Sequence, residues 1–385
     1  MSLIHHFWPF IKIYVFMGHF PLRLNGENQF ISYKKATLIL RYFTGLIITS
    51  AMYLGFSMAD NLSKTDILQN NMESSQVKST YVDIFAQVLG LFGLYFISFM
   101  ITYNNLTMKD NMADFLNYTQ SCAKSKSITE KISLYLIIFF LKFSILAFIF
   151  VFVYQYLESC QWSEPFLALF YGIFIFSWSL WIHGPTITAT ITITESFNRL
   201  KCQMNNLKQD VVFPESCHKS VLKRILDLYQ DVLLKFNPIF SKSYTALTGL
   251  VMGILIPNFY LGISFLFGLS GNAGVMDYIT LIGIHIYSLS FVFLMVLINF
   301  QAHKTMDIWN ELLQSMLQIN PNIKVQVQND HGRFIEYSRQ DLLDYLQYFH
   351  GFDCCGFFQL GKPLLTSVLA TFATYMIILV QFKIS

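Results

Sequence analysis

The sequence is poor in charge. Asp, Glu, Lys and Arg make up only 13% of its 385 residues, about half the fraction found in a typical soluble domain. Hydrophobic residues make up 54%, Phe alone occurs 39 times, and the mean hydropathy is +0.47. This balance excludes an ordinary pair of soluble domains and indicates a protein that crosses a membrane several times.

The sequence also lacks the patterns of a catalytic or metal site. No CxxC pair occurs, and the cysteine spacing predicts neither a disulfide framework nor a zinc or redox motif. The cysteines are Cys122, Cys160, Cys202, Cys217, Cys354 and Cys355. We find no nucleophile–base pair, no phosphate-binding loop and no cluster of metal ligands. We therefore expect no enzymatic activity, no cofactor, no metal and no nucleic-acid partner.

Seven segments are long and apolar enough to cross a bilayer, which takes about 20 residues. They cover residues 36–58, 81–103, 132–156, 165–193, 243–268, 278–300 and 364–382. We therefore predict an all-α membrane protein with seven transmembrane helices. The expected regions are an N-terminal segment (1–35), transmembrane helices 1 to 6 with a ligand-binding region (36–300), a loop with an anchor helix (301–363), and helix 7 with a short tail (364–385).

Basic residues gather on one side of these predicted spans. Most of the 26 Lys and Arg residues lie in the N-terminal segment and in the connections 104–131, 194–242 and 301–363. The positive-inside rule therefore places the N-terminus in the cytoplasm and the C-terminus outside the cell. A G-protein-coupled receptor has the reverse orientation, so we expect no requirement for a G protein.

Three Asn residues match the acceptor pattern for N-glycosylation. In the predicted orientation only Asn61 faces the outside, where it could lie too near the bilayer to be modified. Asn105 and Asn117 would be available only in the reverse orientation. Glycan mapping would therefore test the topology.

Two segments of the cytoplasmic connections have amphipathic helical spacing, residues 216–236 and 338–352. We expect the first to continue into the fifth span as one long helix. Both could be ordinary amphipathic surfaces, but we favour contacts between subunits. The reason is that helices rising from a small membrane protein have few partners of their own. Residues 319–333 are polar, contain Pro and Gly, and predict a loop.

The last predicted helix carries a polar stripe. An i, i+4, i+7 spacing places five residues on one face: Ser367, Thr371, Thr374, Ile378 and Gln381. The ordinary explanation is that hydroxyls bond back to their own helix and that small residues allow close packing. The whole stripe instead favours a water-lined path. One chain offers a single such helix, so a pore would need several copies, for example four.

The same helix predicts where such a pore would narrow. Ile378 and the pair Gln381 and Phe382 would form the constriction, since an apolar ring can hold a pore shut by excluding water. No charged residue lies between Lys362 and Lys383, so no ring of charge would select ions. We expect poorly selective cation conduction.

The end of this helix reads TYMIILVQF, residues 374–382. It resembles the ending of insect gustatory receptors, a Thr-Tyr pair, a five-residue apolar spacer and a Gln-Phe pair. The matching positions are Thr374, Tyr375, Leu379, Gln381 and Phe382. The segment MGHFPLRLN near the N-terminus also resembles that family, and the predicted spans extend the likeness to nearly the whole chain. Insect odorant receptors share this architecture but usually lack the ending.

The resemblance implies a ligand-gated cation channel in the plasma membrane, in the dendrites of gustatory neurons. Four subunits, either identical or with related receptors, would surround one pore in the membrane lipid. The last helix would line this pore, with Gln381 and Phe382 at its gate, and cytoplasmic helices would hold the subunits together. A small-molecule tastant would open the channel from an outward-facing pocket within each subunit.

Polar and aromatic residues in the outer halves of spans two to six suit a small organic ligand. The candidates are Asp83, Gln87, Tyr154, Gln155, Tyr171, Trp178, Asn258, Tyr260, His285 and Tyr287. Asp83 is the most informative, because an acid within a span is costly unless it has a function. Tyr and Trp near an interface can equally form an aromatic belt, and a lone His can be a packed core residue. The set does not choose among a sugar, a bitter compound and an amine.

Two other functions stay open beside a gustatory receptor channel. An odorant-type receptor channel would have the same architecture with a drier pocket. A small-solute transporter would be expected to show repeated halves and ionisable residues at mid-membrane. The sequence shows no convincing repeat, and Lys142 is the main charge near the middle of a span.

Overall fold

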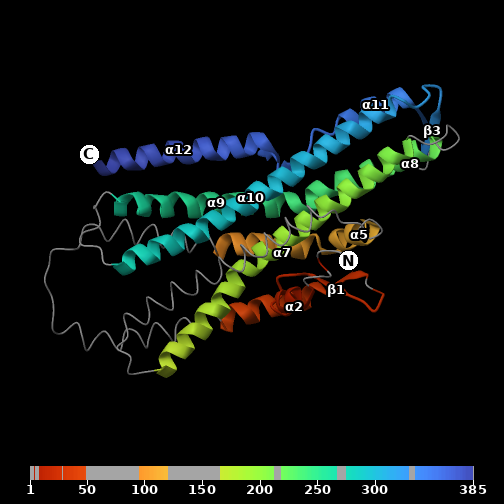
Figure 1. The fold of residues 1–385 in the computed structure, drawn as a ribbon. Coiled ribbons are helices and arrows are strands. Elements are labelled where there is room, and N and C mark those ends of the chain that lie inside the picture. The colour runs from red at the N-terminus through yellow and green to blue at the C-terminus, as the bar shows by residue number, and fades with distance from the viewer. Residues whose placement is uncertain are drawn as a thin grey trace, which may run out of the picture.

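The computed structural model describes residue 4 and residues 8–27, 29–48, 95–119, 165–211, 218–266, 275–328 and 334–384. Within these ranges the chain is mostly helical, and its long helices lie side by side (Figure 1). Three short antiparallel hairpins accompany them in the described part. The predicted predominance of helix is therefore confirmed. None of the helices built from the described residues is both long and apolar enough to span a bilayer.

The N-terminal elements pack beside the long helices. They are α2 (Trp8–Phe16), the antiparallel pair β1 (Leu22–Leu24) and β2 (Phe30–Ser32), and α5 (Lys109–Tyr118), with further helical residues at 35–48 and 95–107. α5 attaches to β2 through Asn117. The Asn117 side chain accepts a hydrogen bond from the N–H of Phe30 at 2.8 Å and donates one to the carbonyl of Phe30 at 2.9 Å.

Three long helical runs form the body of the molecule. They are α7 (Pro165–Val211), then α8 (His218–Asp227), η3 (Leu228–Leu233) and α9 (Leu234–Leu266) in direct succession, and α10 (Val275–Met316). At 1.5 Å per residue, the 47 residues of α7 extend over about 70 Å. The expected continuation of residues 216–236 into the next helix is confirmed, because helix is unbroken from 218 to 266. The helix of the sixth predicted span, 278–300, extends beyond its predicted end, since α10 continues to Met316.

α7 passes through Pro185 without ending. The hydroxyl of Thr188 donates to the carbonyls of Gly184 and Pro185, at 2.9 and 3.0 Å, near the turn where proline supplies no N–H. Gly184 also lets α2 approach closely. A Cβ at this position would lie 2.6 Å from the ring of Tyr14, so a larger residue would push α2 away from α7.

The C-terminal elements follow α10. They are the hairpin of β3 (Lys324–Gln328) and β4 (Phe334–Ser338), α11 (Arg339–Gln347), the short pair β5 (Asp353–Cys354) and β6 (Phe358–Gln359), and α12 (Lys362–Ile384). The predicted loop at 319–333 is therefore wrong for residues 324–328, which pair with β4. The predicted helix in 338–352 is confirmed. Ser338 caps it through a hydrogen bond from the N–H of Asp341, and the Asp341 carboxylate accepts from the N–H of Ser338 at 2.9 Å.

The apolar faces of the two amphipathic segments are buried within the chain. Val221, Leu222 and Ile225 of α8 are at most 3% exposed, and so are Leu342 and Leu346 of α11. The preference for subunit contacts is therefore wrong for these faces. α7 and α10 extend far enough to supply partners for them, because α8 packs against α7 and α11 packs against α10.

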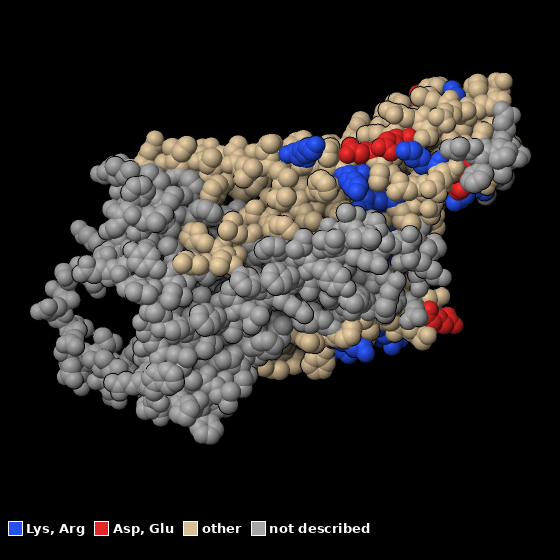
Figure 2. Space-filling view, in the orientation of Figure 1, with Lys and Arg blue, Asp and Glu red and all other residues tan. Residues whose placement is uncertain are grey.

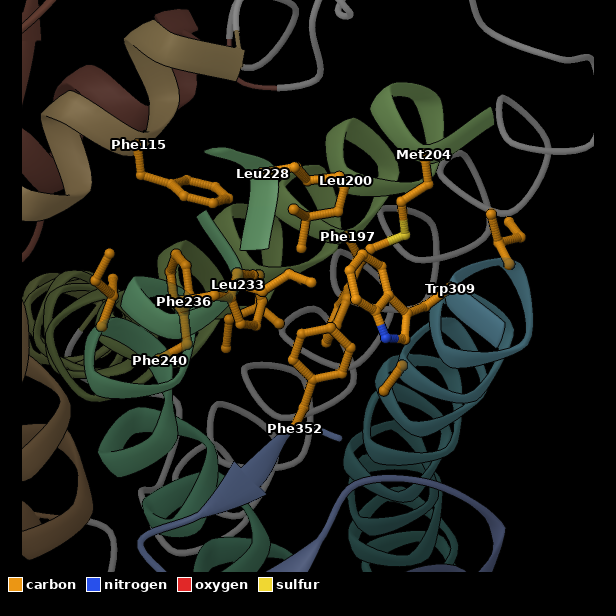
Figure 3. Packing of buried hydrophobic residues seen from close by; sticks show 14 of the residues in the cluster. Phe115, Phe197, Leu200, Met204, Leu228, Leu233, Phe236, Phe240, Trp309 and Phe352 are labelled. Carbon is orange, nitrogen blue, oxygen red and sulfur yellow. The ribbon is translucent and has the colours of Figure 1, made fainter. Parts of the chain in front are cut away.

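An aromatic cluster joins three parts of the chain beneath α12. The ring of Phe197 on α7 lies 4.9 Å from those of Phe236 on α9 and Phe352, measured between centroids. The rings of Phe236 and Phe352 are 5.0 Å apart (Figure 3). Phe352 directly precedes β5, so this packing fixes the segment that leads to the last helix.

A buried ion pair within α7 lies against α5. Glu195 and Arg199 lie one helical turn apart, 2.8 Å between charged atoms, and both side chains are 1% exposed. Arg199 also donates to the carbonyl of Leu116 at 2.5 Å, near the end of α5. Removing one member of such a pair would leave a buried charge, so the pair fixes how these helices meet.

Candidate functional site

The N-terminal end of α12 is held by a buried amide. The Oδ1 of Asn299 on α10 accepts from the N–H of Gly361 at 2.9 Å. Its Nδ2 donates to the hydroxyl of Tyr244 on α9 at 2.5 Å and to the carbonyl of Met295 at 2.9 Å. Asn299 is 0% exposed, so water cannot replace these bonds. One side chain thus connects the start of α12 with both α9 and α10.

The backbone at this junction depends on glycine. Gly361 has φ +143°, a conformation that side chains with a Cβ rarely adopt. The residue directly precedes Lys362, where α12 begins. The direction in which α12 leaves the body of the molecule is therefore set at Gly361.

A second tie lies at the turn between β5 and β6. The hydroxyl of Ser241 on α9 accepts from the N–H of Cys355 at 2.8 Å and lies 3.1 Å from its sulfur. The neighbouring Cys354 is 0% exposed, and burial raises the pKa of its thiol, which stays protonated at neutral pH. The turn and the start of α12 are thus both fastened to α9.

Most of α12 beyond this junction is exposed. Leu364 and Val368 are its buried side chains among those described, and Leu365 and Phe372 are half-buried. α12 lies along α9 at the outside of the molecule (Figure 1). Three large side chains on it are at least half exposed: Leu369, Tyr375 and Ile377. One chain alone therefore covers only one side of α12 near its start.

The predicted polar stripe lies on the exposed part of α12. Ser367, Thr371, Thr374 and Gln381 are exposed, and Ile378 is 39% exposed. The side chain of Phe382 lies outside the described residues. The three hydroxyls donate to carbonyls of their own helix, at 3.0, 2.8 and 2.9 Å in chain order. Each hydroxyl oxygen keeps an acceptor site, so back-bonding and contact with water are compatible.

Comparison with known proteins agrees with this architecture. The family model described as 7tm Chemosensory receptor matches residues 9–385. The chain belongs to this family. The expected membership of an insect chemoreceptor family is therefore confirmed.

Solved structures of one chemosensory receptor share the fold. The insect olfactory receptor OR5 from Machilis hrabei matches with a TM-score of 0.60 and 14% identity over 99% of each chain. The same receptor in complex with eugenol matches with a TM-score of 0.58 and 12% identity, again over 99% of each chain. No curated protein matches the sequence.

For six of the ten predicted ligand residues, the structure shows which helix carries them, but it describes the side chain of only one. Tyr171 and Trp178 lie on α7, Asn258 and Tyr260 on α9, and His285 and Tyr287 on α10. His285 is half-buried, while the other five side chains lie outside the described residues. The other four predicted residues, Asp83, Gln87, Tyr154 and Gln155, also lie outside them. The grouping of all ten residues in one pocket stays a prediction.

A small cavity lies near the base of α12 instead. Its walls include Phe197, Phe236, Ser241, Tyr244 and Leu360. None of the ten predicted ligand residues lines it. Within the described ranges, no group of three or more His, Cys, Asp or Glu side chains could hold a metal ion.

Asn299, Tyr244 and Gly361 were not singled out from the sequence. A signal was present, because Asn299 is a lone amide in the apolar run LMVLINF and Gly361 directly precedes the last helix. Periodicity cannot show that these residues meet. Their contact depends on how α9 and α10 are rotated against each other.

Proposed function

We propose that this chemosensory receptor is a gustatory receptor that acts as a ligand-gated, poorly selective cation channel of the plasma membrane. A small tastant bound within each subunit opens it. The observation that carries the proposal is α12, a helix that is uncharged between Lys362 and Lys383 and exposed along its polar stripe. Its ending, TYMIILVQF, favours the gustatory branch over the odorant branch.

The exposure of α12 supports assembly from several subunits. Hydroxyls line one face of this helix and large apolar side chains line others. Water would solvate the first face well but not the others, and lipid would do the reverse. Copies of α12 around an axis solve this conflict, since the stripe then faces a water-filled path and Leu369 and Ile377 face lipid or a neighbouring subunit. We propose a tetramer, formed by this chain alone or with related receptors, with Gln381 and Phe382 at the gate.

The side-chain contacts of two Asn residues are compatible with the proposed cytoplasmic N-terminus. The Nδ2 atoms of Asn105 and Asn117 donate to the carbonyls of His19 and Phe30, at 3.2 and 2.9 Å. Glycans attach to this nitrogen, which here is engaged within the fold. Neither acceptor motif therefore argues for an outside location of residues 105–119.

The ligand class is proposed by analogy. Eugenol, a small molecule, is bound to OR5 in one of the similar structures. We propose that a small organic molecule likewise binds this chain, among the outer halves of its helices, with Asp83 as one contact. Replacing Asp83 by Asn is expected to shift ligand sensitivity, and an unchanged dose–response curve would remove Asp83 from the pocket.

Current recordings from cells that express this chain alone test the proposal. Sucrose, quinine, an amine and eugenol serve as the initial panel. A current that begins within milliseconds and resists G-protein block supports a channel. Uptake of a solute without conductance would instead support a transporter. A response confined to volatile compounds such as eugenol would favour the odorant-type alternative.

Thiol accessibility tests the pore role of α12 directly. In the presence of an activating compound, a charged thiol reagent is expected to block current through Thr374→Cys within the polar stripe. Ala373→Cys is the matched control, one residue along the same helix and also exposed but on another face. Equal block of both variants, or block of neither, would contradict a water-lined stripe.

A further inference from the structure

Basic side chains lie near the beginning of the helix of residues 35–48. Lys34 and Lys35 stand where residues 35–48 become helical, and both are exposed. Arg23 on β1 and Lys12 on α2 are exposed as well, and Arg41 is half-buried. Basic side chains are visible along the edge of the molecule that carries α2 and β1 (Figure 2).

Two of these cations share one aromatic ring. The guanidinium carbon of Arg23 lies 5.6 Å from the ring centroid of Tyr33, and that of Arg41 lies 5.0 Å from it. Arg41 also donates to the carbonyl of Val15 near the end of α2, at 3.2 Å. The aromatic face attracts each cation, but two like charges at one ring also repel each other. An anion between them would relieve this repulsion.

The described part of the chain supplies no such anion. Lys12, Arg23, Lys34, Lys35 and Arg41 form no ion pair with a described carboxylate. The carboxylate of Asp110, which reaches Ser32 beside Tyr33, is paired with Lys109 at 2.9 Å. Glu27 lies in the exposed turn between β1 and β2. Within the described part of the chain these five cations therefore have no carboxylate partner, and four of them are exposed.

Large apolar side chains lie beside these cations. Phe16 and Ile13 on α2 are 76% and 43% exposed. Leu40 and Phe43, on the helix of residues 35–48, are 68% and 51% exposed. Gly18 holds the two elements together, since a Cβ there would lie 2.8 Å from the backbone of Leu38 and of Tyr42. The apolar and basic groups therefore belong to one continuous surface.

We propose that this basic surface binds the headgroups of anionic phospholipids. It consists of Lys12, Arg23, Tyr33, Lys34, Lys35 and Arg41. The phosphate and carboxylate of phosphatidylserine supply the missing anions, while Phe16, Leu40 and Phe43 reach toward the acyl chains. Arg41 belongs to both parts of this surface, because it lies on the helix that carries Leu40 and Phe43 while its guanidinium lies over the ring of Tyr33. The proposal rests on the membrane location and the cytoplasmic N-terminus proposed above.

The test measures lipid binding by the purified full-length chain in a neutral detergent, and it needs no channel current. Short-chain phosphatidylserine is titrated against the protein, with short-chain phosphatidylcholine as the uncharged comparison. We expect phosphatidylserine to bind at least tenfold more tightly. Arg23→Gln combined with Lys34→Gln is expected to weaken it about tenfold or more, since each cation near an anionic lipid contributes about a factor of five.

Lys219→Gln combined with Lys223→Gln is the matched control, because both residues are exposed on α8 and the same charge is removed. This control is expected to bind like the unchanged chain. Equal binding of the two lipids, or an equal loss in both double variants, would overturn the proposal. Inorganic phosphate at the same concentration distinguishes a lipid from a free anion. If it competed as strongly as phosphatidylserine bound, the lipid headgroup would not be the ligand.

Discussion

Two regions of this receptor differ in how far their large apolar side chains are buried. Around α8 and α11, the chain buries its own large side chains, and Trp309 on α10 is only 1% exposed between the rings of Tyr229 and Phe349. Along α12, large apolar groups such as Leu369 remain 62% exposed. In the first region, the apolar faces are buried by other parts of the same chain. The second has a defined helix with few partners among the described residues, which is the basis of the proposed assembly from several subunits.

Truncating Trp309 is expected to have the largest effect on stability. Trp309→Ala removes a fully buried aromatic group from contacts with Tyr229 on η3 and Phe349 after α11, and such changes cost about 3–5 kcal/mol. Thermal unfolding of the purified chain measures the loss. Ile377→Ala on α12 is the comparison, and a cost below about 0.5 kcal/mol is expected for an exposed group. Similar losses in both variants would erase the contrast between the two ends.

Asn299 tests the junction between the two regions. Asn299→Leu removes the bonds to Gly361 and Tyr244 and leaves buried groups without partners, at a cost of about 1–3 kcal/mol. In the proposed channel we expect a shifted dose–response curve or a resting current, with ion preference unchanged. Thr366→Ala, at an exposed position near the start of α12, is the control. A change in ion preference without a change in gating would contradict the assigned role.

His19 predicts a loss of stability in mild acid. It is 0% exposed beside Thr102, and burial lowers its pKa to about 3. The unfolded chain takes up this proton near pH 6.5, so stability is retained above that pH and lost as the pH falls toward 3. His19 should therefore contribute a loss of about 2 kcal/mol between pH 7 and pH 5.

Unfolding of His19→Gln and the unchanged chain at both pH values isolates this contribution. The variant should show a shallower decline between pH 7 and pH 5. His350→Gln, at an exposed position, is the matched control and should decline as the unchanged chain does. Parallel declines in all three proteins would show that His19 is not kept neutral by the fold.

Replacing the cap of α11 should have the smallest effect. Ser338→Ala removes the hydrogen bond from the Asp341 N–H to the Ser338 side chain, and such caps contribute about 1 kcal/mol. Hydrogen exchange at the start of α11 should accelerate accordingly. Ser315→Ala, a half-buried serine within α10 whose hydroxyl donates to the carbonyl of Glu311, should leave that exchange unchanged.

Much of the helical framework could be predicted from the sequence. The last helix was expected over 364–382 and covers Lys362–Ile384. A long apolar run between two Lys residues strongly favours a single helix, so the prediction was close. The extension of α10 to Met316 was missed, since its charged residues after 300 resembled a loop. The strand Lys324–Gln328 was missed although KVQVQ alternates as strands do, because nearby Pro and Gly outweighed that alternation.

The candidate site could be predicted only in part. Residue spacing alone shows which polar side chains of α12 share one face, so this stripe could be predicted from the sequence. The hydrogen bond between Asn299 and Gly361 could not, because it joins residues that are 62 positions apart in the sequence. The error about subunit contacts arose in the same way. The lengths of α7 and α10 beyond the predicted spans were unknown, and these lengths supply the partners of α8 and α11.

The unbroken helical run of residues 218–266 has a mechanical consequence. Such a run can act as a lever, with Tyr244 near its midpoint and Phe236 of the aromatic cluster within it. A small tilt of either end would displace the hydroxyl of Tyr244 and, through the amide of Asn299, the backbone of Gly361 directly before the last helix. Motion at the far end of this lever would thus reach α12 without crossing any loop.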